Sequence, residues 1–149
     1  KMKFYYGNMN ERQFRNVYRK AIKKKGNTTE NLVGILERRL DTVVYRAKFA
    51  TTVFSSRQLI NHGHIKVNGK KVNIPSYLVR AEDNIEIKDK SKDLTIISGA
   101  LVNKERDVPD YIQIDDKNKK AKLIRVPKFS EVPYPSIMEP NLVIEYYSR

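Results

Sequence analysis

The side chains of this chain that are most able to bind a ligand by charge are its arginines and lysines. Thirty Lys and Arg stand against seventeen Asp and Glu, which gives a net charge of +13. Two tracts contain no carboxylate: residues 12–29 hold seven bases, and residues 42–81 hold seven bases over forty residues. Because a solvated protein face usually mixes both signs, this segregation predicts a polyanionic partner, either nucleic acid or an anionic membrane surface.

Catalytic chemistry lacks the residues that it needs. His62 and His64 flank a glycine without an acid cluster nearby, and the chain has no cysteine, so a metal site is not expected. Ser55 and Ser56 precede His62, but no partner carboxylate follows and no strand-turn-helix elbow frames them. We therefore predict no enzyme activity, no catalytic residue, no metal site and no cofactor.

Length and hydropathy limit the remaining classes. A chain of 149 residues that is 40% hydrophobic can bury one core, or one core and a smaller satellite. No apolar segment approaches the ~20 residues that span a bilayer, and the N-terminus lacks the apolar core of a secretory signal. We expect a soluble, intracellular protein with no membrane partner and no small-molecule substrate.

The first basic tract falls on a helix expected over residues 10–25. Its apolar positions recur at helical spacing: Phe14, Val17, Tyr18, Ala21 and Ile22. The arginines on the other side are Arg12, Arg15 and Arg19. Gly26 should end this helix, and Asn27, three residues before Glu30, has the spacing of a capping box that starts the next one.

That next helix carries one buried stripe, Leu32, Leu36, Leu40 and Val44, so we expect it to run without interruption. Turning it by about 100° per residue places Glu37, Asp41 and Lys48 on one flank. The other flank is free of acids and consists of Arg38, Arg39, Thr42, Tyr45 and Arg46. Guanidinium groups match phosphate oxygens and a Tyr ring can stack on an unpaired base, so this flank is predicted to face RNA. For Arg38 alone, pairing with Asp41 is an equal alternative.

A short helix and a hairpin are expected next. Thr52 is a plausible N-cap for a helix from Val53 to His62, which Gly63 ends. Its core side should hold Val53, Ser56, Leu59 and Ile60, and its outer side Gln58, Asn61 and His62. The Asn68-Gly69 pair then predicts a tight turn between Ile65–Val67 and a return strand, Lys70–Ile74, with Lys66, Lys70 and Lys71 around it. Another strand is expected over Ile85–Ile87.

The C-terminal part is nearly balanced in charge. Residues 91–104 could form a helix, although Thr95, Ile96, Ile97 and Gly99 weaken that prediction. The segments "YIQID", "DKNKK" and "AKLIRV" predict a second hairpin, and five prolines from Pro109 to Pro140 favour extended connections. We expect a structural extension that packs on the preceding unit.

Several segments resemble a known family. "LERRLDTVVYRAKFATT", "SRQLINHGHIKVNGKKVNIPSY" and "IEI" look like the S-four RNA-binding module, which pseudouridine synthases and tyrosyl-tRNA synthetases share over about residues 36–87. "NERQFRN", "KGNTTENLVGILERRLDTVVYR" and "LVIEYYSR" resemble more specifically the bacterial and organellar family of the fourth small-subunit ribosomal protein, from about Tyr5 to Arg149.

The resemblance implies an α+β fold in three parts. Residues 1–35 would form a basic helical segment that packs with the C-terminus, residues 36–87 the helix-loop-helix and hairpin module, and residues 88–149 a mostly β extension. It also implies a primary binder of small-subunit (16S-type) rRNA that nucleates assembly of the five-prime domain and supports decoding accuracy. Neighbouring small-subunit proteins, notably the fifth, are the expected protein partners.

The resemblance and the charge pattern together imply a set of RNA-binding residues: Arg12, Arg15, Arg19, Arg38, Arg39, Tyr45, Arg46, Thr52, Arg57, Gln58, His62, Lys66, Asn68, Gly69, Lys70 and Lys71. Two positions depart from the family, which usually has Arg and Glu where this chain has Val53 and Ser55. This puts one phosphate contact and one capping box in question. The family also usually has a further segment before the position of Lys1.

Another class of function uses the same module. A stand-alone RNA chaperone or ribosome-recycling factor would show the same basic surface, and sedimentation with small subunits at moderate salt would separate the two. The expected location is the ribosome, either in the cytoplasm of a bacterium or in an organelle such as the mitochondrion.

Overall fold

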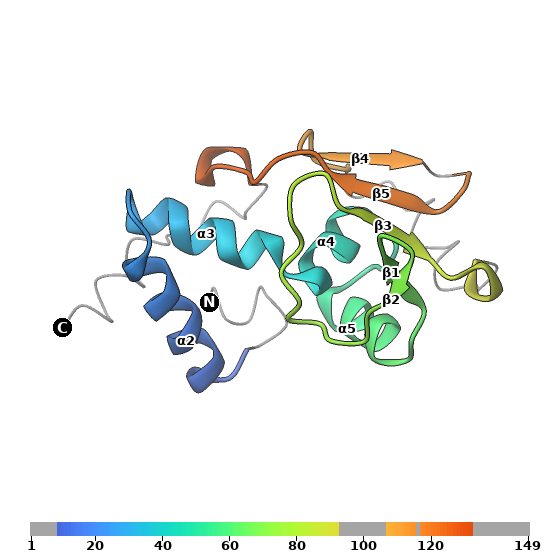
Figure 1. The fold of residues 1–149 in the computed structure, drawn as a ribbon, viewed down its shortest axis with the longest axis horizontal. Helices are drawn as coiled ribbons and strands as arrows, with labels where there is room; N and C mark the ends of the chain where they lie inside the picture. Colours follow the sequence, from blue (N-terminus) through green and yellow to red (C-terminus); the bar gives the residue numbers. More distant parts are fainter. Residues whose placement is uncertain (1–8, 93–106, 116, 133–149) are drawn as a thin grey trace. The chain divides into compact units, whose positions relative to one another are not determined.

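The computed structural model describes residues 9–92, 107–115 and 117–132 (Figure 1). These residues belong to two compact units. One comprises residues 9–37 and 127–132, and the other lies within residues 38–126. The helices and strands are those of an α+β protein, as the sequence predicts. The helix expected over residues 91–104 lies almost wholly outside the described residues.

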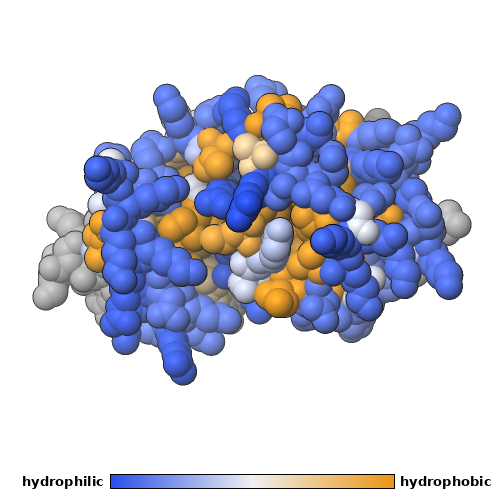
Figure 2. All heavy atoms as spheres, viewed as in Figure 1, coloured by the Kyte–Doolittle hydropathy of each residue, from blue (hydrophilic) through white to orange (hydrophobic). Residues whose placement is uncertain are grey.

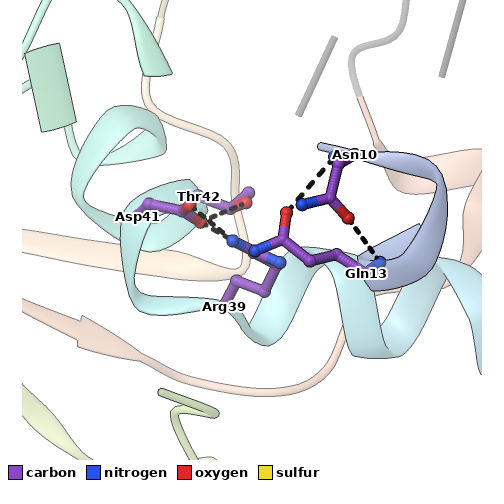
Figure 3. Close-up of polar contacts among 5 residues, drawn as sticks. All are labelled: Asn10, Gln13, Arg39, Asp41 and Thr42. Carbon is purple, nitrogen blue, oxygen red and sulfur yellow. Dashed lines mark hydrogen bonds and ion pairs between the residues drawn. The ribbon is translucent and has the colours of Figure 1, made fainter. Parts of the chain in front are cut away.

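The first described helix of the first unit is α2, Glu11–Lys23. Asn10 caps it by accepting a hydrogen bond from Gln13 N (2.8 Å), while Gln13 Oε1 accepts one from Asn10 N (3.3 Å; Figure 3). This reciprocal pair is a capping box, which satisfies two backbone N–H groups at the start of the helix. The predicted stripe is buried except at Ile22, which is 51% exposed. Gly26, at φ +103°, lies just beyond the end of the helix.

Helix α3, Thr28–Arg38, is capped by Asn27, as the sequence predicts. The Asn27 side chain accepts a hydrogen bond from Glu30 N (3.1 Å). Asn31 Nδ2 donates to the carbonyls of Ala21 and Lys24 at 3.1 Å each, which joins α3 to the end of α2. The Glu30 carboxylate accepts a hydrogen bond from Phe129 N (2.9 Å), so the short 3₁₀ helix η2, Phe129–Glu131, is held in the same unit.

The prediction of one continuous helix up to Val44 is wrong, because the helix is interrupted at Arg39. Arg39 is extended (φ −60°, ψ 139°), and helix α4, Leu40–Arg46, begins after it. A distant loop supplies hydrogen bonds at the interruption: Leu40 N donates to Tyr77 O (2.8 Å) and Val79 N donates to Arg38 O (2.7 Å). Arg39 also forms an isolated antiparallel bridge with Leu78.

Helix α5, Val53–Asn61, has the predicted cap and the predicted buried side. Thr52 Oγ1 accepts a hydrogen bond from Ser55 N and donates one to Ser55 Oγ, both at 3.0 Å. The serine hydroxyl thus contacts the cap where the family usually has a glutamate. Val53, Ser56, Leu59 and Ile60 are buried.

The hairpin follows, with β1 (Ile65–Val67) paired to β2 (Lys70–Lys71). Asn68 and Gly69 both have positive φ, 51° and 83°, which is the backbone of a type I′ turn. The return strand is shorter than the predicted Lys70–Ile74, and Ile74 is 57% exposed. The chain leaves the sheet after Lys71 and continues toward the loop that contacts Arg38 and Leu40.

Five antiparallel strands form one sheet in the order β2-β1-β3-β5-β4 (Figure 1). The last three are β3 (Asn84–Ile87), β4 (Ile112–Asp115) and β5 (Lys120–Leu123), and a 3₁₀ helix η1 (Asp89–Ser91) follows β3. Because β5 pairs with β3, the C-terminal hairpin extends the sheet of the module. Helices α4 and α5 contribute to a single hydrophobic core with the sheet, including Leu40, Val44, Ile60, Ile65 and Ile85.

Candidate nucleic-acid interface

Three arginines form an exposed row along α2, opposite its buried stripe. Arg12, Arg15 and Arg19, here called the α2 row, are all exposed. They are spaced by three and four residues, so they lie on one side of the helix over a length of about 10 Å. In the described part of the chain, no carboxylate forms an ion pair with any of them. This row can contact phosphate oxygens as the sequence predicts, and its role stays a prediction.

Arg39 does not belong to an exposed flank. It is 4% exposed and donates to the buried Asp41 carboxylate from Nε (3.2 Å) and from Nη2 (3.0 Å; Figure 3). Thr42 Oγ1 donates to the same carboxylate at 3.3 Å. Residues two apart on a helix do not face each other, so this pair exists only because the helix is interrupted at Arg39.

The rest of the predicted flank is also not one surface. Arg46 is 3% exposed, and its guanidinium lies 5.8 Å from the centroid of the half-buried Tyr45 ring. Arg38 is half-buried, and its Nε donates to Val79 O at 2.9 Å instead of pairing with Asp41. Thr42 is buried. The prediction of an exposed, acid-free flank is therefore wrong. It assumed a rotation of about 100° per residue from Arg38 to Arg46, and this rotation does not hold across the interruption at Arg39.

A second exposed basic surface lies where α5 meets the hairpin. It consists of Gln58, His62, Gly69, Lys70 and Lys71, all exposed, and is called here the α5–hairpin surface. Lys71 extends over Gly63: its Nζ lies 3.2 Å from the position that a Cβ on Gly63 would occupy. The absence of a side chain at Gly63 thus lets the ammonium group approach the end of α5, next to His62.

Asn68 has a structural part in this turn. Its Oδ1 accepts a hydrogen bond from Asn84 N (2.8 Å), and its Nδ2 donates to Asp83 Oδ1 (2.9 Å). Asp83 Oδ2 in turn accepts from Arg80 N at 2.9 Å. The amide that the sequence suggested for RNA is therefore engaged in joining the hairpin to β3.

Lys66 lies on the outer face of the sheet, where side chains of both charges occur. One register row crosses the strands and contains Lys71, Lys66, Glu86, Lys120 and Asp115. A hydrogen bond from Lys92 lowers the pKa of the neighbouring Asp89, and hydrogen bonds from Asn118 lower the pKa of Asp115. Both exposed acids thus keep their charge, so this face suits phosphate less well than the α5–hairpin surface does.

Helix α5 holds two further residues of interest. Arg57 is half-buried beside the exposed Gln58, and Thr52 is exposed but occupied as the helix cap. Phe54 is 53% exposed on the same helix. Hydrophilic residues cover most of the face that Figure 2 shows.

Two other kinds of site find no support in the described residues. Within these ranges, no group of three or more His, Asp or Glu side chains could hold a metal ion. Among the helices of the same ranges, none is long and apolar enough to cross a membrane.

Comparison with known families matches both parts of the chain. A family model described as "S4 domain" matches residues 38–85, and one described as "Ribosomal protein S4/S9 N-terminal domain" matches residues 1–37. The first match begins at the residue where the second compact unit begins. The fold, the basic surfaces and these matches define a class, the ribosomal proteins that carry an S4 domain.

Curated relatives narrow this class to one family. The protein named "Small ribosomal subunit protein uS4" of Pelagibacter ubique (strain HTCC1062) is 71% identical over the whole chain, which covers 73% of that relative. Proteins of the same name from Gluconacetobacter diazotrophicus and Beijerinckia indica are 59% and 60% identical, with the same coverage. The chain belongs to the family of small ribosomal subunit protein uS4.

Proposed function

We propose that this protein is a structural constituent of the small ribosomal subunit and binds its rRNA. The observation that carries the proposal is the 71% identity to a small ribosomal subunit protein over all 149 residues. The α2 row and the α5–hairpin surface supply exposed cations, as binding to phosphate requires. The proposed role of the chain is to bind and position rRNA, not to catalyse a reaction.

The finer role rests on the family resemblance. The protein is a primary rRNA binder that helps to nucleate the five-prime domain, contacts the fifth small-subunit protein and supports accurate decoding. The relatives named above come from bacteria, which supports a ribosome of bacterial type, either in a bacterium or in an organelle. A recycling factor remains distinguishable: a structural protein stays with small subunits through a moderate-salt gradient, whereas a recycling factor is washed off or sediments with large subunits.

The test of RNA binding is a filter-binding titration of small-subunit rRNA over a range of salt concentrations. Replacing Arg15 and Arg19 by Gln should reduce the slope of log affinity against log salt by about two, because each lost phosphate contact removes about 0.9. The matched control replaces the exposed Lys90 and Lys117 by Gln, and should leave the slope unchanged. Equal slopes for the two double variants would remove the α2 row from the interface.

A further inference from the structure

Asn68 is the asparagine of this sequence whose context most favours deamidation. In that reaction the backbone nitrogen of the next residue attacks the side-chain carboxamide carbon, and a side chain on the next residue hinders the attack. Gly69 has no side chain, and no other asparagine of the sequence precedes a glycine. Both residues are exposed, and a Cβ placed on Gly69 would meet no described atom within 4 Å apart from those of its chain neighbours. The turn is therefore open to water.

Hydrogen bonds hold the Asn68 carboxamide in place while the hairpin is closed. Its Oδ1 accepts from Asn84 N (2.8 Å), and its Nδ2 donates to Asp83 Oδ1 (2.9 Å). The backbone N of Asn68 also donates to Asn84 O (2.8 Å). Deamidation expels Nδ2 and joins Cγ to the Gly69 nitrogen, so it breaks the bond to Asp83 and displaces Oδ1 from Asn84 N. The closed hairpin should therefore slow the reaction, and local opening should permit it.

Neither product of the reaction can restore these contacts. Aspartate at position 68 has no Nδ2 donor, and it places a second carboxylate against that of Asp83. Isoaspartate carries the chain through the side-chain carbon, which inserts a methylene group into a two-residue turn. The register of that turn pairs Val67 with Lys70, and an extra backbone atom disturbs it. Deamidation would thus weaken the hairpin permanently.

We propose that Asn68 is a deamidation site that the closed hairpin protects and that opening of the hairpin exposes. The Gly69 nitrogen gives up its proton and forms a bond to Asn68 Cγ, while the Cγ–Nδ2 bond breaks and Nδ2 leaves with a proton as ammonia. Water then opens the cyclic imide at Cγ, which gives aspartate, or at the backbone carbonyl, which gives isoaspartate. No oxidation or reduction takes place. This inference goes beyond the proposed function, because it concerns the covalent ageing of the chain and does not depend on RNA.

The experiment follows deamidation of the free full chain in mildly alkaline buffer, with and without guanidinium chloride. Peptide mass spectrometry measures conversion at each asparagine, and enzymatic methylation measures isoaspartate. In denaturant, Asn68 should react faster than Asn73, which precedes an isoleucine. Without denaturant, the Asn68 rate should fall at least about tenfold, because the reaction then waits for local opening. Equal Asn68 rates in the two conditions would overturn the protection, and an Asn68 rate in denaturant no faster than that of Asn73 would overturn the site.

Two variants isolate the hydrogen bond to Asp83. Asp83→Ala removes the acceptor of Nδ2 and should raise the Asn68 rate several-fold without denaturant, but not in denaturant. Asp115→Ala is the matched control, because it removes a carboxylate that accepts from Asn118 Nδ2 (2.8 Å) in the other hairpin. It should leave the Asn68 rate unchanged. Circular dichroism checks that both variants stay folded, and equal Asn68 rates in the two would show that the contact with Asp83 does not protect.

A further variant reproduces one product. Asn68→Asp should lower the urea midpoint of unfolding, because it removes the donor to Asp83 and adds a like charge beside it. Asn73→Asp makes the same change at an exposed asparagine after the strand and should leave the midpoint nearly unchanged. Equal midpoints for the two variants would contradict the predicted damage to the hairpin.

Discussion

At the scale of single residues, Arg39 and Asp41 show how an apparent RNA contact becomes part of the core. The sequence places two adjacent arginines at the edge of an apparently continuous helix, and nothing local, no glycine or proline, marks the interruption. The bonds that replace the helical ones come from Tyr77 and Val79, which are far away in the chain. Local periodicity cannot predict such an interruption. The predicted orientations of the Arg39 and Asp41 side chains are therefore wrong.

Replacing Arg39 by Ala should destabilise the fold. Asp41 is fully buried, and removal of its guanidinium partner should lower the free energy of unfolding by about 3–5 kcal/mol. The measurement is urea unfolding followed by circular dichroism. Replacing both members, with Arg39→Met and Asp41→Leu, should cost less than Arg39→Ala alone, because neither charge of the pair is then left buried without its partner. A loss below about 1 kcal/mol for Arg39→Ala would mean that the buried pair contributes little.

At the scale of elements, the sequence predicts best what local signals determine. The Asn27 and Thr52 caps, the Asn68-Gly69 turn and the buried side of α5 are all present as predicted. Each depends on residues within a few positions of one another, so pattern and propensity are sufficient. The return strand was predicted too long, because the chain is drawn away after Lys71 toward contacts with Arg38 and Leu40.

Replacing Asn68 by Ala should loosen the hairpin. The change removes two side-chain hydrogen bonds, one from Asn84 N and one to Asp83 Oδ1. Alanine must then adopt a φ of +51° without these bonds. We expect a loss of about 1–3 kcal/mol in the free energy of unfolding, measured by urea denaturation. Asn73→Ala, at an exposed asparagine after the strand, is the control and should change stability by at most about 0.5 kcal/mol. Similar values for the two variants would show that the Asn68 contacts do not hold the turn.

At the scale of the whole molecule, one sheet joins the two hairpins that the sequence predicts. The sequence predicts both hairpins, but the pairing of Ile85 with Ala121 joins residues from either side of a long connection. No local pattern encodes that register. The second unit therefore has its own complete core, drawn from residues 40–123.

A fragment of residues 38–126 should fold by itself. All members of its core lie inside the fragment, so we expect cooperative urea unfolding and dispersed amide signals in an NMR spectrum. The fragment lacks the α2 row, so its salt slope for rRNA should be shallower than that of the full chain. An unfolded fragment would contradict the claim that the second unit folds by itself. A salt slope equal to that of the full chain would contradict a contribution of the α2 row to RNA binding.

The most direct test of RNA binding is a chemical footprint of the full chain on naked small-subunit rRNA. We expect protection confined to the five-prime domain, weakened when Arg15 and Arg19 are both replaced by Gln. Protection spread over unrelated regions of the RNA, or its absence at salt concentrations where the chain still binds, would contradict the account.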